Sequence, residues 1–149
     1  MTATSYRQMV GAVALVLWAS SLMLPAVTMC PDIVWPGWHV VLLGPLGLII
    51  GQFGWYANPL LLWMSLRLLF RYRAGVAGGL VCLALALTSF LWTGIHGFDK
   101  PAIICERNIG FYAWIATAVL LAVAAFVEKL FGPSRGQMPL DSRPSTTTD

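Results

Sequence analysis

Charged side chains are scarce in this chain of 149 residues. Asp, Glu, Lys and Arg make up 10% of it, and the formal net charge is +3. So small a positive charge gives no basic surface for a nucleic acid, and we expect no nucleic-acid partner. The centres of the long apolar runs also lack ionisable residues, which usually mark proton and ion pathways in membranes. The sequence therefore disfavours a pump or a proton-coupled carrier.

Motifs that carry enzyme chemistry are also missing. The chain has no glycine-rich phosphate loop, no HExxH, no nucleophile elbow and no paired carboxylates within its apolar runs. Its 3 cysteines include no CxxC pair, on which thiol oxidoreductases of four-helix architecture rely. We therefore expect a non-enzymatic protein without a cofactor.

What the chain does contain is long apolar stretches, at 9–29, 38–66, 75–95 and 109–127. A helix needs about 20 apolar residues to cross a bilayer, and these stretches lack the alternation of barrel strands. A hydrophobic share of 58% suits a chain surrounded mostly by lipid. The sequence predicts an all-α membrane protein whose residues 1–131 form a bundle of four transmembrane helices.

The distribution of basic residues predicts the orientation of this bundle. Of the 9 basic residues, only Lys100 and Arg107 fall in the connections between the first and second stretches and between the third and fourth. The others fall on the opposite side: Arg7, Arg67, Arg71, Arg73, Lys129, Arg135 and Arg143. By the positive-inside rule we expect both termini in the cytoplasm and a multi-pass protein of the bacterial inner membrane. The tail 132–149 is rich in Gly, Pro, Ser and Thr, so we expect it to be disordered.

Glycines in the second apolar stretch are spaced for helix packing. Steps of three and four residues would place them on one face of a helix, and the stripe comprises Gly44, Gly47, Gly51, Gly54 and Asn58. Small residues let helix backbones approach closely in a membrane. We expect a groove filled by another helix, with Asn58 hydrogen-bonded across the seam.

Two prolines, Pro45 and Pro59, interrupt the same stretch. Each removes a backbone donor, from the carbonyls of Val41 and Trp55 respectively. The kink and polar-site candidates are Gln52, Asn58 and Pro59. Two readings stay open, a bend that satisfies its own polar groups and a site for an ion or a polar group.

Two cysteines, Cys30 and Cys105, are expected on the same outer side. The sequence leaves open whether they form a disulfide, because that requires α-carbons within about 7 Å. His39 and His96 are the weak metal candidates; the nearby acids are Asp32, Asp99 and Glu106. These donors are scattered without a ligand motif, so no metal site is predicted.

Three functional hypotheses follow. The first is a small integral inner-membrane protein that acts through helix contacts as an accessory, assembly or immunity-type partner. Its partners would be the lipid bilayer and either a membrane protein or a second copy of the chain. The second is a small oligomeric transporter or channel that uses the kinked helix near Gln52 and Asn58. The third is an outward-facing thiol or metal enzyme.

Overall fold

The computed structural model describes residues 3–30, 32–48, 52–96 and 101–131. The α-helices are α1 (Ala3–Met23), α2 (Gly37–Leu43), α3 (Ala57–Leu69), α4 (Val76–Thr88) and α5 (Ile109–Phe131). Short 3-10 helices are η1 (Gly44–Leu48), η2 (Gly54–Tyr56) and η3 (Ser89–Leu91). The strands are β1 (Pro25–Met29), β2 (Ile33–Pro36), β3 (Gly94–His96) and β4 (Pro101–Arg107). The tail 132–149, which we predict to be disordered, lies outside the described residues.

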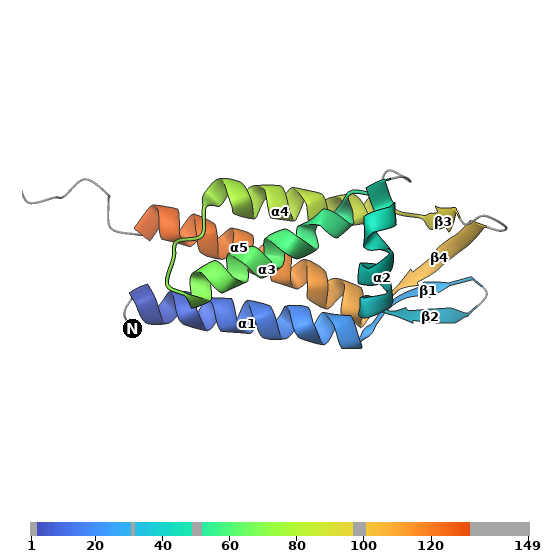
Figure 1. Cartoon of the computed structure of the whole chain (residues 1–149), viewed down its shortest axis with the longest axis horizontal. Coiled ribbons are helices and arrows are strands. Elements are labelled where there is room, and N and C mark those ends of the chain that lie inside the picture. Colours follow the sequence, from blue (N-terminus) through green and yellow to red (C-terminus); the bar gives the residue numbers. More distant parts are fainter. Residues whose placement is uncertain (1–2, 31, 49–51, 97–100, 132–149) are drawn as a thin grey trace, which may run out of the picture.

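The longer helices form an elongated body, with the sheet at one end (Figure 1). The helices α1, α3, α4 and α5 run along the long axis, and α2 lies across them beside the sheet (Figure 1). The start of α1, the connection from α3 to α4 and the end of α5 lie together at the opposite end (Figure 1). Within this body α5 packs against both α1 and α4.

The predicted all-α fold class is wrong, because the structure contains a small antiparallel sheet. The strand order is β2-β1-β4-β3, with Val27 opposite both Trp35 and Arg107. The chain leaves α1 just before Pro25, which cannot donate to a helix, and continues as a short extended run. Val27 and Met29 are buried there, and their backbone groups bond to neighbouring strands instead of a helix.

The predicted four membrane spans are also wrong. Among the described residues, α5 alone is long and apolar enough to cross a membrane, and Val76–Leu91 forms a shorter apolar helix. The stretch 38–66 is broken into α2, η1, η2 and α3, of which α3 has 13 residues. At about 1.5 Å per residue α3 is shorter than a ~30 Å hydrocarbon core. The predicted multi-pass topology in the inner membrane, with both termini in the cytoplasm, is therefore wrong as well.

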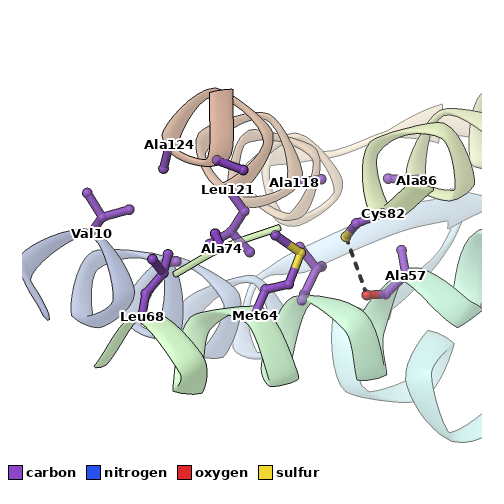
Figure 2. Close-up of a cluster of buried hydrophobic side chains, with 13 residues drawn as sticks. Val10, Ala57, Met64, Leu68, Ala74, Cys82, Ala86, Ala118, Leu121 and Ala124 are labelled. Atoms are coloured by element: carbon purple, nitrogen blue, oxygen red, sulfur yellow. Dashed lines mark hydrogen bonds between the residues drawn. The ribbon is translucent and has the colours of Figure 1, made fainter. Parts of the chain in front are cut away.

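The core of the helical body is built from small side chains and a few large ones. Figure 2 shows Met64, Leu68 and Leu121 packed among alanines of several helices. Glycines allow the closest approaches. A Cβ on Gly11 of α1 would lie 2.7 Å from the Ser65 carbonyl of α3, and one on Gly79 of α4 would lie 3.1 Å from Ala122 of α5. Helix packing through small residues therefore centres on Gly11 and Gly79, which lie outside the predicted glycine stripe.

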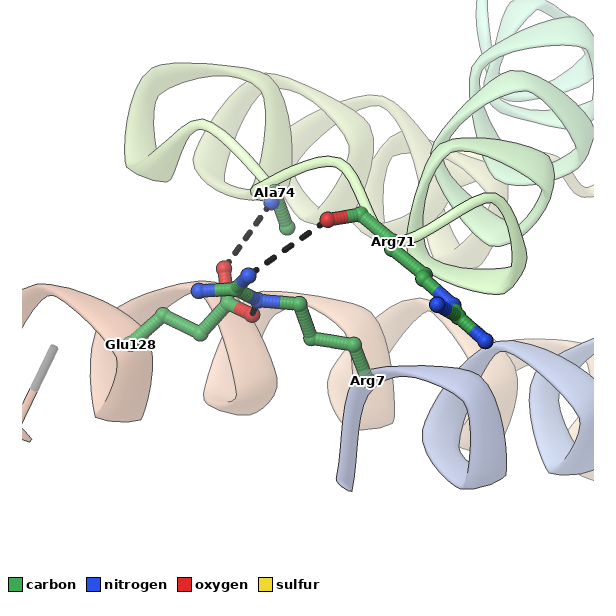
Figure 3. Close-up of polar contacts among 4 residues, drawn as sticks. All are labelled: Arg7, Arg71, Ala74 and Glu128. Carbon is green, nitrogen blue, oxygen red and sulfur yellow. Dashed lines mark hydrogen bonds and ion pairs between the residues drawn. The ribbon is translucent and has the colours of Figure 1, made fainter. Parts of the chain in front are cut away.

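A polar cluster links the elements at the end of the body opposite the sheet. Glu128 of α5 accepts from Arg7 Nε of α1 at 2.6 Å and from the Ala74 backbone N–H at 3.0 Å (Figure 3). Arg7 Nη1 also donates to the Arg71 carbonyl at 3.4 Å. The paired side chains are only 14% and 7% exposed, so the ion pair is shielded and linked by further hydrogen bonds. It joins α1, α5 and the connection that precedes α4.

Candidate functional site: an apolar cavity beside Asn58

The broken second stretch folds back on itself and builds one wall of the site. The chain leaves α2 through η1, and the Gln52 N–H then donates to the Gly47 carbonyl at 2.7 Å. A Cβ on Gly44 would overlap the indole of Trp55, and one on Gly47 would lie 2.6 Å from the Gln52 carbonyl. These two glycines therefore let the segment close on itself.

The predicted glycine stripe does not form one groove, because the range 38–66 is not one helix. Gly44 and Gly47 meet residues of their own segment, whereas Gly54 faces Ser89, whose Cβ would lie 2.9 Å from an added Cβ. Gly51 lies outside the described residues. The close contacts at Gly44, Gly47 and Gly54 are thus internal to the molecule.

Asn58 is the hydrogen-bonding centre of this region. Its Oδ1 accepts from the indole N–H of Trp18 at 3.1 Å and from that of Trp114 at 2.9 Å. Its Nδ2 donates to the Trp55 carbonyl at 3.1 Å. The residue is 8% exposed and joins α3 to α1 and α5. An amide with these partners is engaged by the protein itself.

Both prolines of the segment are compensated by side chains. Pro59 cannot donate to the Trp55 carbonyl, and the Asn58 amide does so instead. Pro45 cannot donate to the Val41 carbonyl, and the Trp55 indole N–H bonds to it at 2.7 Å, alongside the Gly44 N–H. The bend therefore satisfies its own carbonyls, and neither is left open to bind an ion.

An apolar cavity of about 140 Å³ lies between this segment, α1, β1 and α5. Its lining includes three tryptophans, Trp55, Trp92 and Trp114, each of which makes a hydrogen bond through its indole N–H. Apolar residues make up most of the remaining lining, among them Leu22, Val27, Val40, Val41 and Phe111. Ser21, Gln52, Asn58 and Ser89 supply the polar side chains, and no charged residue is among the described residues of the lining.

Arg107 supports one side of this cavity, a role that could not be predicted from the sequence. Its Nη2 donates to the carbonyls of Phe90 at 2.9 Å and Trp92 at 2.7 Å. Its guanidinium carbon lies 5.7 Å and 5.5 Å from the ring centres of Phe90 and Phe111. Cation–π contacts of this kind hold aromatic rings in place. The sequence offered only a basic residue in a loop as a signal.

Cys30 and Cys105 form a disulfide, which the sequence had left open. The α-carbons lie 5.8 Å apart, and the bridge links the end of β1 to β4 across 75 residues. The Cys30 N–H also donates to the Ile103 carbonyl at 2.9 Å. Structural disulfides are typical of oxidising compartments. Cys82 is the free, buried cysteine of the described residues and lies 3.8 Å from the Ala57 carbonyl (Figure 2).

The structure does not assemble a metal centre from the predicted donors. The His39 ring lies against that of Trp38, with ring centres 3.8 Å apart and planes tilted by 48°, and His96 lies in β3. Asp99 lies outside the described residues. Within the part of the chain that the structure describes, no group of three His, Cys, Asp or Glu residues is placed to bind a metal ion.

Comparison with known proteins gives no relative. No family model, curated protein or solved structure matches this chain. Functional inference therefore depends on the chemistry of its own surface and cavity.

Proposed function

We propose that this protein is a non-enzymatic, membrane-anchored partner protein that acts through apolar contacts. The observation that carries the proposal is an apolar stripe along the outer face of α5, with residues three or four apart. The stripe comprises Tyr112, Ala116, Val119, Val123, Phe126 and Leu130. Its large members are between 42% and 59% exposed, while the opposite face of α5 is buried in the bundle.

An exposed apolar stripe needs an apolar surrounding, and we assign it to lipid hydrocarbon. Among the described helices, α5 combines such a stripe with the length of a membrane span, so we assign the hydrocarbon contact to α5. The length and composition of α5 suit it to anchor the protein.

The sheet end is the surface that we assign to a protein partner. Ile33 and Val34 of β2 and Ile103 of β4 are each more than half exposed, although they are large and apolar. The disulfide that braces this end fits an oxidising compartment outside the anchor. An accessory, assembly or immunity-type role would use this rigid end to contact its target.

Flotation with phosphatidylcholine vesicles in detergent-free buffer tests the anchoring. The intact protein should float with the vesicles, and Val123→Asp should largely abolish flotation. A charge of this kind costs about 2.5–3.5 kcal/mol at the centre of an inserted helix. The matched control is Ile33→Asp, since Ile33 is 56% exposed and Val123 is 54% exposed, but Ile33 lies in β2, outside the proposed anchor. A wild-type protein that stays dispersed as a monomer, or a Val123→Asp variant that floats normally, would overturn the proposal.

A second candidate is the transport of a small molecule, favoured by the cavity at Gln52 and Asn58. Flux through proteoliposomes distinguishes it from a contact function. Transport that is lost when the cavity is filled by Val40→Trp would place this candidate first. Equal permeability of empty and protein-containing vesicles would remove it.

A further inference from the structure

We infer that the cavity beside Asn58 is a binding site for an uncharged hydrocarbon group, such as a short alkyl chain. The lining residues that the structure describes include no charged side chain, so a charged ligand would lose its hydration without gaining a counter-charge from them. Valine, leucine and aromatic side chains form most of the surface that such a group would touch. The cavity therefore suits an apolar ligand.

The size of the cavity matches a small apolar group. Its volume is about 140 Å³. An engineered apolar cavity of about 150 Å³ stays dry and binds benzene or xenon. A chain of several methylenes or a single ring therefore fills the space, and a larger ligand would have to extend beyond it.

Fixed tryptophans keep the cavity open. The indoles of Trp55, Trp92 and Trp114 are tied respectively to the Val41 carbonyl, the Gly94 carbonyl and Asn58 Oδ1, at 2.7, 2.9 and 2.9 Å. A ring that swung inward to fill the space would have to give up its hydrogen bond. The site is thus pre-organised, and its occupant does not have to displace side chains.

Gln52 provides the side chain that would bind the polar end of the ligand. The Asn58 amide is engaged by Trp18, Trp55 and Trp114, whereas the half-buried Gln52 amide also lines the cavity. An amide both donates and accepts, so it suits a hydroxyl or carbonyl at the end of the hydrocarbon. The ligand class is therefore an apolar chain that is uncharged at its polar end.

Photolabelling of the full-length protein in nanodiscs tests the site. One arm uses a free alkyl alcohol that carries a diazirine, and the other uses a phosphatidylcholine with the diazirine at the end of an acyl chain. We expect adducts on the cavity segments 37–47 and 110–114, located by mass spectrometry. Cavity labelling by the alcohol alone identifies a free small molecule, and cavity labelling by the lipid identifies an acyl chain. Absence of cavity adducts in both arms would overturn the inference.

Filling the cavity provides the specific control. Val40 lines it, and Val40→Trp should lower cavity labelling at least about tenfold while labelling of the outer face of α5 is unchanged. Leu42→Trp, on the same helix but 68% exposed and outside the lining, should label like wild type. Equal cavity labelling in Val40→Trp and Leu42→Trp would contradict the assignment. An intact Cys30–Cys105 bridge and a cooperative thermal transition would show that the variants fold.

A competition experiment on the wild-type protein needs no variant. Unlabelled straight-chain alcohols should block cavity labelling about fourfold more strongly for each added methylene, until the cavity is full. Potency should then level off, because further methylenes remain outside. Potency that is independent of chain length would exclude a hydrocarbon site. Because cavity and α5 adducts are read separately, failure here is distinguishable from failure of the proposed anchor.

Discussion

Asn58 shows how one side chain can replace a missing backbone donor and also pair two buried indoles. It accepts from two indoles and donates to the carbonyl that Pro59 leaves without a donor. We predict that Asn58→Ala lowers the free energy of unfolding by about 2–4 kcal/mol, because two indole donors and a carbonyl lose their partner. Gln52→Ala, which leaves these groups paired, should change it by less than about 1 kcal/mol. Thermal unfolding in detergent micelles measures both, and equal stability of the two variants would contradict this role of Asn58.

Substitution of Ser65 should raise the free energy of unfolding, in contrast to substitution of Asn58. The Ser65 side chain is 1% exposed, and its Oγ has no hydrogen-bond partner among the described residues. Burial of an unsatisfied hydroxyl costs free energy, so Ser65→Ala should raise the free energy of unfolding by about 1 kcal/mol. Ser21→Ala is the matched control, since Ser21 is also buried but donates to the Trp18 carbonyl at 2.6 Å. Destabilisation by Ser65→Ala would mean that the hydroxyl has a partner.

Among the elements, the second apolar stretch, 38–66, is only partly predictable from the sequence. The sequence located Pro45 and Pro59 and the carbonyls that they affect. It did not show that the chain reverses between them, because Trp55 reaches Val41 from 14 residues away through tertiary structure. The length of the apolar run therefore predicted helix correctly in parts of 38–66, and it could not predict the breaks.

The sheet was missed for a related reason. Its strands have between 3 and 7 residues, and β1 pairs with β4 across most of the chain. Such pairing depends on distant partners rather than on a local pattern. The cysteines were the one residue-level signal, since a bridge between Cys30 and Cys105 requires the two segments to meet. The candidate Asn58 was found from sequence, but its tryptophan partners and the cavity were not.

Close packing between helices is testable at Gly79. A Cβ there would lie 3.1 Å from Ala122 and 3.3 Å from Ala125, so Gly79→Leu should destabilise the protein by about 1–3 kcal/mol. Ala116→Leu adds a leucine at an exposed position of α5 and should be close to wild type. Thermal unfolding compares the two. Equal tolerance of both changes would mean that α4 and α5 do not pack through Gly79.

At the scale of the whole molecule, the disulfide and the Arg7–Glu128 cluster fasten opposite ends of the body. The bridge closes a loop of 75 residues, for which the chain-entropy estimate is roughly 4 kcal/mol. Reduction should therefore lower the thermal transition substantially. Maleimide-PEG should add once to the denatured, unreduced protein, at Cys82, and three times after reduction. Three additions without reductant would show that Cys30 and Cys105 are unpaired.

Contact between the outer face of α5 and lipid hydrocarbon can be measured by spin-label accessibility. A nitroxide is attached at Val123→Cys in a Cys82→Ala background that keeps the disulfide, and the protein is placed in phosphatidylcholine nanodiscs. Tyr72, 63% exposed in the connection between α3 and α4, provides the comparison site as Tyr72→Cys. We predict that the label at 123 is accessible to dissolved oxygen and shielded from a water-soluble nickel chelate, with the reverse at 72. A label at 123 that is as accessible to the nickel chelate as the label at 72 would contradict the account.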